Sequence, residues 1–263
     1  MLVDTHAHIH FDEFTNDLST LFDNCRAAQV ETIITVGTND TDSRDALNFS
    51  INPLVLDKAK GIKIFATVGI HPHDAKLGED AFLSVKELTQ NEDYEKTLVA
   101  IGECGLDYCK NFSSQAEQFR MLEWQLELAQ ECDLPVIFHV RDAWDDFFAI
   151  IKKYPKTRGV IHSFTGGLKE VELANALGVY FGMNGIMTFT KDSSQLEAVK
   201  LVSQDKLLLE TDCPFLTPVP YRGKRNEPSF VSATATFIAD LREQQLTDLV
   251  SESTNNAKKL FTL

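Results

Sequence analysis

The stretch DTHAHI, residues 4–9, places two histidines one position apart in a run that is typical of a buried β-strand. Alternate side chains of a strand point to the same side, so His6 and His8 share one face with Asp4 and His10. Two imidazoles on neighbouring pleats can hold a metal ion between them, whereas the simpler interpretation is a pair of hydrogen-bonded core histidines. For a same-face pair at the end of a strand we favour the metal.

Apolar, β-branched runs alternate with amphipathic segments along the chain. The predicted strands are residues 2–9, 32–36, 62–70, 98–102, 135–140, 159–164, 179–183 and 207–210. The predicted helices are residues 17–28, 42–59, 81–89, 114–131, 143–154, 169–177, 194–202 and the region 230–263. This alternation predicts a parallel sheet, and eight units fit an α/β protein with a single (β/α)8 TIM barrel across residues 1–263. A doubly wound open sheet is the alternative, but the first strand–helix turn lacks its glycine fingerprint.

The composition limits the class of protein. A formal net charge of −14 argues against a broad basic surface for nucleic acid, but it leaves room for a phosphate substrate at a pocket that holds cations. The five cysteines are scattered and form no CxxC pair, which predicts a reduced protein. No apolar run is long enough for a membrane span and no secretory signal is evident, so we expect a cytoplasmic protein without a membrane partner.

Residues that can bind a metal or an anion follow the ends of most predicted strands, and all seven histidines lie at or near such ends. The carboxyl ends of the strands meet at one face of a (β/α)8 barrel, so we expect these side chains to converge. They are His6, His8, His71, His73, Glu103, Asp107, His139, Arg141, Asp142, His162, Glu210 and Asp212. Such nitrogen and carboxylate ligands suit Zn²⁺, Mn²⁺ or Mg²⁺.

Two of the acids have the surroundings of functional residues. Glu103 follows Gly102 on a central strand, and a carboxylate there can offer one oxygen to each of two metals about 3.5–4 Å apart. Asp212 follows a buried strand and could bind metal while it takes a proton from a water molecule. The alternative role of Asp212 is a helix cap ahead of Pro214.

Six motifs in this order resemble the TatD family of metal-dependent hydrolases, the TatD-type deoxyribonucleases. They are DTHAH (4–8), GIHPH (69–73), GECGLDY (102–108), PVIFHVRDA (135–143), HSFTG (162–166) and ETDCPFLTPVPYRGKRNEP (210–228). The resemblance implies a (β/α)8 barrel with two divalent metal ions, Mg²⁺, Mn²⁺ or Zn²⁺, and hydrolysis of phosphodiesters. We expect an exonuclease that acts on the ends of single-stranded DNA or RNA.

The resemblance also implies roles for residues. The first metal would be held by His6, His8, Glu103 and Asp212, and the second by Glu103, His139 and His162. Glu103 and Asp212 would be catalytic, with Asp212 orienting the attacking water and accepting its proton. For binding of the substrate we predict His71, His73, Arg141, Arg222 and Arg225, although residues 222–225 also read as an ordinary solvated loop.

Two other functions stay open. An amidohydrolase-type enzyme could cleave C–N or ester bonds on the same scaffold, but many such barrels bridge their metals with a modified lysine where this chain has Glu103. A non-catalytic metal-binding scaffold predicts a lost ligand, and none of the expected ligands is missing.

Overall fold

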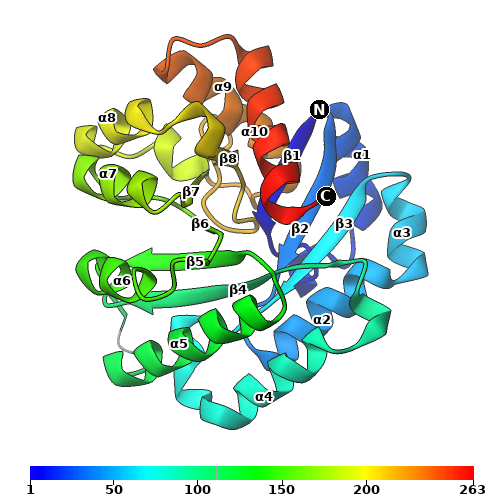
Figure 1. Cartoon of the computed structure of the whole chain (residues 1–263). Coiled ribbons are helices and arrows are strands. Elements are labelled where there is room, and N and C mark those ends of the chain that lie inside the picture. The colour runs from blue at the N-terminus through cyan, green and yellow to red at the C-terminus, as the bar shows by residue number, and fades with distance from the viewer. Residues whose placement is uncertain (111) are drawn as a thin grey trace.

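The computed structural model describes residues 1–110 and 112–263. Its parallel strands pair in chain order from β1 to β8, with helices around them (Figure 1). The strands are β1 (Leu2–Ala7), β2 (Val30–Val36), β3 (Lys63–Val68), β4 (Leu98–Asp107), β5 (Val136–Arg141), β6 (Gly159–Ile161), β7 (Tyr180–Met183) and β8 (Leu207–Leu209). These eight strands form a nearly closed barrel, which confirms the predicted fold class.

Helices surround the strands. The α-helices are α1 (Leu18–Ala27), α2 (Asp40–Ile51), α3 (Pro53–Ala59), α4 (Gly78–Thr89), α5 (Gln115–Glu131), α6 (Trp144–Ile151), α7 (Leu168–Ala176), α8 (Ser193–Leu201), α9 (Val231–Leu241) and α10 (Leu246–Phe261). Of these, α1 to α8 lie between successive strands, and α9 and α10 follow β8. Short 3₁₀ helices are η1 (Asp12–Phe14), η2 (Pro72–Leu77), η3 (Glu92–Tyr94), η4 (Gly185–Thr188), η5 (Gln204–Lys206) and η6 (Pro228–Phe230). Among the described residues, every helix is too short or too polar to cross a bilayer.

Strand alternation sorts the apolar residues into two cores. Ile33 belongs to the large core between strands and helices, whereas its neighbour Ile34 belongs to a smaller core inside the barrel. Leu260 and Phe261 of α10 join that smaller core. The apolar part of the barrel interior is therefore filled, and its carboxyl end is left for polar side chains.

The prediction of one helix across residues 42–59 is wrong, because the chain forms α2 and α3 there. Pro53 lacks a backbone N–H and its ring would clash with the preceding turn, so the first helix ends. The side chain of Asn52 accepts a hydrogen bond from the backbone N–H of Leu54 at 2.9 Å and caps the second helix.

Several strands end at other residues than predicted. β1 ends at Ala7 instead of residue 9, and β6 ends at Ile161 instead of residue 164. Ser163 adopts a left-handed backbone conformation, with φ of 47°, which cannot continue the predicted strand 159–164. β4 is longer than predicted and reaches Asp107, so Glu103 lies within the strand.

The barrel closes between β8 and β1 largely through contacts beyond the regular ladder. The backbone N–H of Asp212 bonds to the carbonyl of His6 at 2.8 Å. The buried carboxyl group of Asp4 accepts from the N–H of Thr211 at 2.9 Å and from its hydroxyl at 2.6 Å. Burial raises the pKa of Asp4 to about 8, although the hydrogen bonds from Thr211 act in the opposite direction.

Replacing Asp4 tests this closure. We expect Asp4→Ala to lower the free energy of unfolding by about 1–3 kcal/mol, because the buried N–H and hydroxyl of Thr211 lose their acceptor. Urea denaturation of the metal-free protein measures the change. Asp45→Ala, at an exposed position of α2, is the control and should stay within about 0.5 kcal/mol of the parent protein. Equal stability of the two variants would show that Asp4 does not hold the seam.

Candidate metal centre

A cavity of about 920 Å³ opens at the carboxyl ends of the strands. Its lining includes His8, Phe11, Thr38, His71, His73, Asp74, Glu103, His139, Arg141, Asp142, Trp144, His162, Ser163, Gln195, Asp212 and Phe215. Side chains from almost every strand end therefore meet in one place, as the barrel topology requires.

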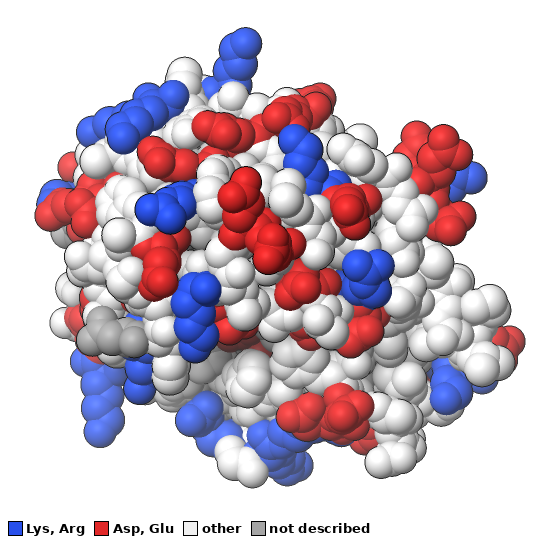
Figure 2. All heavy atoms as spheres, turned by 90° about the horizontal axis from the view of Figure 1, so that it is seen from below, with Lys and Arg blue, Asp and Glu red and all other residues white. Residues whose placement is uncertain are grey.

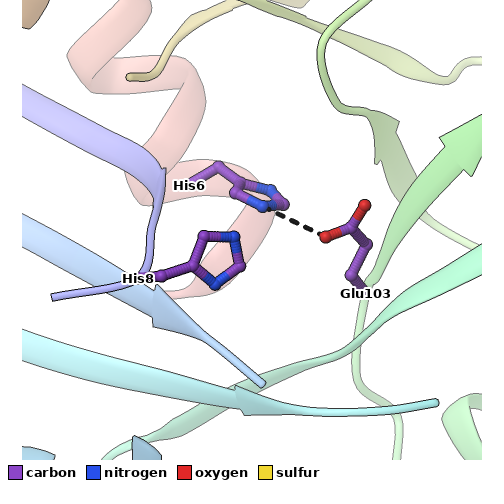
Figure 3. A group of neighbouring side chains, drawn as sticks. All are labelled: His6, His8 and Glu103. Atoms are coloured by element: carbon purple, nitrogen blue, oxygen red, sulfur yellow. Dashed lines mark ion pairs between the residues drawn. The ribbon is translucent and has the colours of Figure 1, made fainter. Parts of the chain in front are cut away.

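Glu103 is the common neighbour of the predicted metal ligands. Its Oε1 lies 2.7 Å from His139 Nδ1 and 2.8 Å from His162 Nε2. Its Oε2 lies 3.3 Å from His6 Nε2 (Figure 3). One buried carboxylate from β4 thus faces imidazoles from β1, from β5 and from the loop after β6. Oε1 faces His139 and His162, and Oε2 faces His6.

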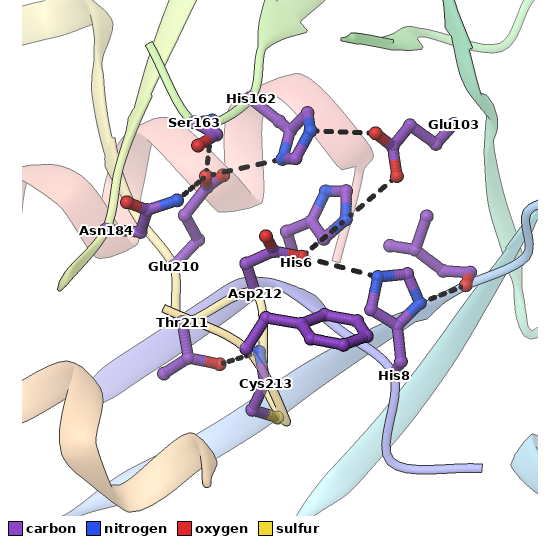
Figure 4. A network of polar contacts seen from close by, with 12 residues as sticks. His6, His8, Glu103, His162, Ser163, Asn184, Glu210, Thr211, Asp212 and Cys213 are labelled. Carbon is purple, nitrogen blue, oxygen red and sulfur yellow. Dashed lines mark hydrogen bonds and ion pairs between the residues drawn. The ribbon is translucent and has the colours of Figure 1, made fainter. Parts of the chain in front are cut away.

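Asp212 completes the group from the loop after β8. Its Oδ1 lies 3.4 Å from His8 Nε2 and 3.6 Å from His6 Nε2 (Figure 4). The other ring nitrogen of His8, Nδ1, lies 2.8 Å from the carbonyl oxygen of Val36. A carbonyl only accepts, so Nδ1 carries a proton, and Nε2 is the nitrogen that faces Asp212 and the cavity.

The residues present fit a divalent cation. Both ring nitrogens of His6 are buried without a hydrogen-bond partner in the described structure, and buried polar atoms in proteins are otherwise paired. Ligand atoms within 4.8 Å of one another form three groups of three residues: His6, His8 and Glu103; His6, His162 and Asp212; and His71, Glu103 and His139. Imidazole and carboxylate donors are the ligands that Zn²⁺ and Mn²⁺ prefer.

The pKa shifts reflect how closely these groups lie. Burial opposes the ionised form of Glu103, but the neighbouring imidazoles of His162 and His71 and the hydrogen bond with His139 hold its pKa well below the usual value. Burial likewise opposes the charged form of His162, yet Glu103 raises the pKa of that imidazole well above its usual value. The acid is therefore ionised at neutral pH and attracts cations.

A backbone hydrogen bond determines the position of the proton on His71. Its Nδ1 accepts a hydrogen bond from the backbone N–H of His73 at 3.1 Å, so a neutral ring carries its proton on Nε2. Burial and the neighbouring His139 hold the pKa of His71 well below its usual value, which keeps the ring neutral. Nε2 lies 3.5 Å from Glu103 Oε1, but as a proton carrier it suits donation to a substrate better than ligation of a metal.

The three arginines predicted to bind substrate lie in different surroundings. Arg141 lines the cavity and is exposed. Arg222 lies over the ring of Phe189 and donates to the carbonyl of Thr217 at 2.8 Å. Arg225 forms an ion pair with Asp17 at 2.6 Å. Arg222 and Arg225 are outside the cavity lining, and contact of these two residues with a substrate stays a prediction.

Asn184, which lies behind the predicted ligand His162, was missed by the sequence analysis. Asn184 follows β7 directly and its amide lies 3.4 Å from Glu210 Oε1, an oxygen that also accepts from the N–H of Ser163 at 2.6 Å (Figure 4). The same oxygen lies 3.6 Å from His162 Nδ1. Asn184 could have been found by its position, because it is a polar residue at the carboxyl end of a predicted strand.

The surface charge agrees with the composition. On the face shown in Figure 2, acidic and basic side chains are interspersed, and the described residues of that face form no continuous basic surface. Among its described residues, this face therefore has no broad basic area, in agreement with the net negative charge of the chain.

Comparisons with known proteins agree with the geometry. The family model for TatD related DNase matches residues 3–262. The chain is 37% identical over 270 residues to the uncharacterized metal-dependent hydrolase YabD of Bacillus subtilis, with 100% of both chains covered. It is 35% identical over 260 residues to the 3′–5′ ssDNA/RNA exonuclease TatD of Erwinia tasmaniensis, covering 95% of this chain and 96% of the relative.

Solved structures extend the likeness to three dimensions. The crystal structure of YjjV, a TatD homologue from Escherichia coli, superposes with a TM-score of 0.90 at 26% identity, over 100% of this chain and 98% of the other. Because the family model covers nearly the whole sequence, the chain belongs to the TatD-related DNase family of metal-dependent hydrolases.

Proposed function

We propose that this protein removes nucleotides from the ends of single-stranded DNA or RNA with the help of two divalent metal ions, Mg²⁺, Mn²⁺ or Zn²⁺, in the cytoplasm. Membership of the family supports phosphodiester hydrolysis. Several relatives are named 3′–5′ ssDNA/RNA exonucleases, which supports the choice of single strands and of strand ends.

One observation carries the proposal. Six potential ligands from different parts of the barrel lie together at one cavity: His6, His8, Glu103, His139, His162 and Asp212. Unrelated structural histidines would have no reason to meet there. The two oxygens of Glu103 face different imidazoles, which supports a carboxylate shared between two ions.

The chain's own groups have distinct tasks in the reaction. Bound divalent ions supply Lewis acidity, which makes water more acidic and offsets charge on the phosphoryl oxygens. Asp212 orients the attacking water and accepts its proton. Burial opposes ionisation of Asp212, but the hydrogen bond from His8 and the nearby imidazole of His6 lower its pKa, so a carboxylate is present at neutral pH.

Two groups on the cavity wall are suited to hold the phosphate. His71 is a neutral donor through Nε2, and the exposed guanidinium of Arg141 can grip two phosphate oxygens at once. Both lie beside the ligand set without belonging to it, so they act on the substrate rather than on the metal.

Removal of the metal tests the proposal as a whole. We expect a chelator to abolish cleavage of end-labelled single-stranded DNA, and Mg²⁺, Mn²⁺ or Zn²⁺ to restore it. Shortening from one end, seen on a denaturing gel, distinguishes an exonuclease from an endonuclease. Hydrolysis of a cyclic amide or lactone in place of DNA and RNA would favour an amidohydrolase. Metal uptake without any turnover would favour a scaffold.

Replacing Asp212 tests the proton acceptor. We expect Asp212→Asn to lower kcat by roughly 10²–10⁴-fold, because an amide keeps the shape but cannot accept the proton. The assay is run at saturating metal, with metal content measured on the same sample. Asp57→Asn, at an exposed position of α3, should keep the parental rate. Full turnover by the metal-loaded Asp212 variant would refute the role.

Replacing Arg141 tests the phosphate contact. We expect Arg141→Ala to raise KM roughly tenfold or more with a smaller effect on kcat, since a hydrogen bond to a charged group contributes about 1.5–3 kcal/mol. The rise should shrink at high salt, where ion pairs are screened. Arg44→Ala, on the exposed side of α2, is the control. An unchanged KM would mean that Arg141 does not contact the substrate.

A further inference from the structure

The carboxylate of Asp107 lies between two imidazoles at the end of β4. Its Oδ2 is 3.1 Å from His139 Nε2 and 2.9 Å from His73 Nε2. Asp107 is fully buried. It therefore connects a predicted metal ligand with a histidine on the cavity wall.

The orientation of this carboxylate is fixed from the other side. Its Oδ1 accepts from the backbone N–H groups of Cys109 and Lys110, each at 2.9 Å. Gln118 of α5 holds the main chain of Asp107, accepting from its N–H at 2.8 Å and donating to its carbonyl at 3.0 Å. Oδ1 is thus committed to the loop, and only Oδ2 faces the imidazoles.

The geometry determines which nitrogen of His139 carries the proton. With donors on all sides Asp107 is an acceptor, so His139 Nε2 carries a proton and donates it. Nδ1 lies 2.7 Å from Glu103 Oε1 and 3.4 Å from His162 Nε2, so it is the nitrogen whose lone pair would face a metal ion held with Glu103. A lone pair at that position is what a metal ligand requires.

We propose that Asp107 is a positioning residue that holds His139 in the tautomer with a free Nδ1, and that it fixes the tautomer of His73 in the same way. The inference rests on the metal-dependent function proposed above. It assigns to the GLDY part of the GECGLDY motif a task that the metal ligands themselves do not perform.

An amide at this position should reverse the tautomer. In Asp107→Asn the amide oxygen remains where the two loop N–H groups point, so the NH₂ group replaces Oδ2. That group donates, and His139 Nε2 must then accept, which moves the ring proton to Nδ1. The variant keeps the size of the side chain but blocks the lone pair that faces Glu103.

Binding of Zn²⁺ by the stripped protein measures the consequence. We expect Asp107→Asn to weaken Zn²⁺ binding about 10- to 100-fold at one site. Competition with a chromophoric chelator measures the affinity. Asp146→Asn is the matched control, because Asp146 accepts a hydrogen bond from the neighbouring Tyr108 and contacts no imidazole of the site. Affinities equal to the parent protein in both variants would overturn the inference.

A second measurement uses the Zn²⁺-loaded parent protein and does not depend on the Asp107 variant. Long-range ¹H–¹⁵N correlation spectra report which ring nitrogen of each histidine carries the proton, and the His139 signal is assigned by its loss in His139→Asn. We expect the proton on Nε2. A proton on Nδ1 would overturn the inference, while leaving the proposed nuclease function untouched. Absence of Zn²⁺ binding in the parent protein would instead argue against the proposed metal-dependent function.

Discussion

A buried carboxylate needs positive charge or donors around it, and Glu103 meets this requirement with imidazoles from several strands. The chain around it is adapted to this position. A Cβ at Gly102 would lie 2.6 Å from the carbonyl oxygen of Ile137, and one at Gly105 would lie 1.9 Å from that of His139. Glycine on both sides of Glu103 therefore lets β4 approach β5 closely enough for the carboxylate to reach His139.

The site and the closure of the barrel depend on the same segments. His6 lies on β1 and Asp212 follows β8, and these are the two strands between which the regular ladder is interrupted. Asp4 and Thr211 join the two strands next to those residues. Loss of this seam would separate His6 and His8 from Asp212, so the stability of the seam and the assembly of the metal ligands are physically linked.

Acceptor groups outside the ligand set lie beside the imidazoles of three predicted ligands. Asp107 faces His139 from one side and Glu210 lies near Nδ1 of His162 from the other. For His8 the acceptor is the carbonyl of Val36. Each of these three ligands thus has one nitrogen toward the cavity and the other near an acceptor, the arrangement by which proteins orient metal-binding histidines.

The sequence alone determined the fold class and the set of residues at the carboxyl ends of the strands. Strand and helix periodicity are local signals, and a parallel barrel brings all strand ends to one face whatever the loops do. Local signals failed where a single residue redirects the chain, as at Pro53, or where a left-handed residue such as Ser163 ends a strand. Only the tertiary structure decided which nitrogen of His71 or His139 faces the cavity, since that depends on hydrogen bonds as short as 3.1 Å to groups on other segments. Periodicity can place a side chain on a face, but contacts made by packing determine where its proton lies.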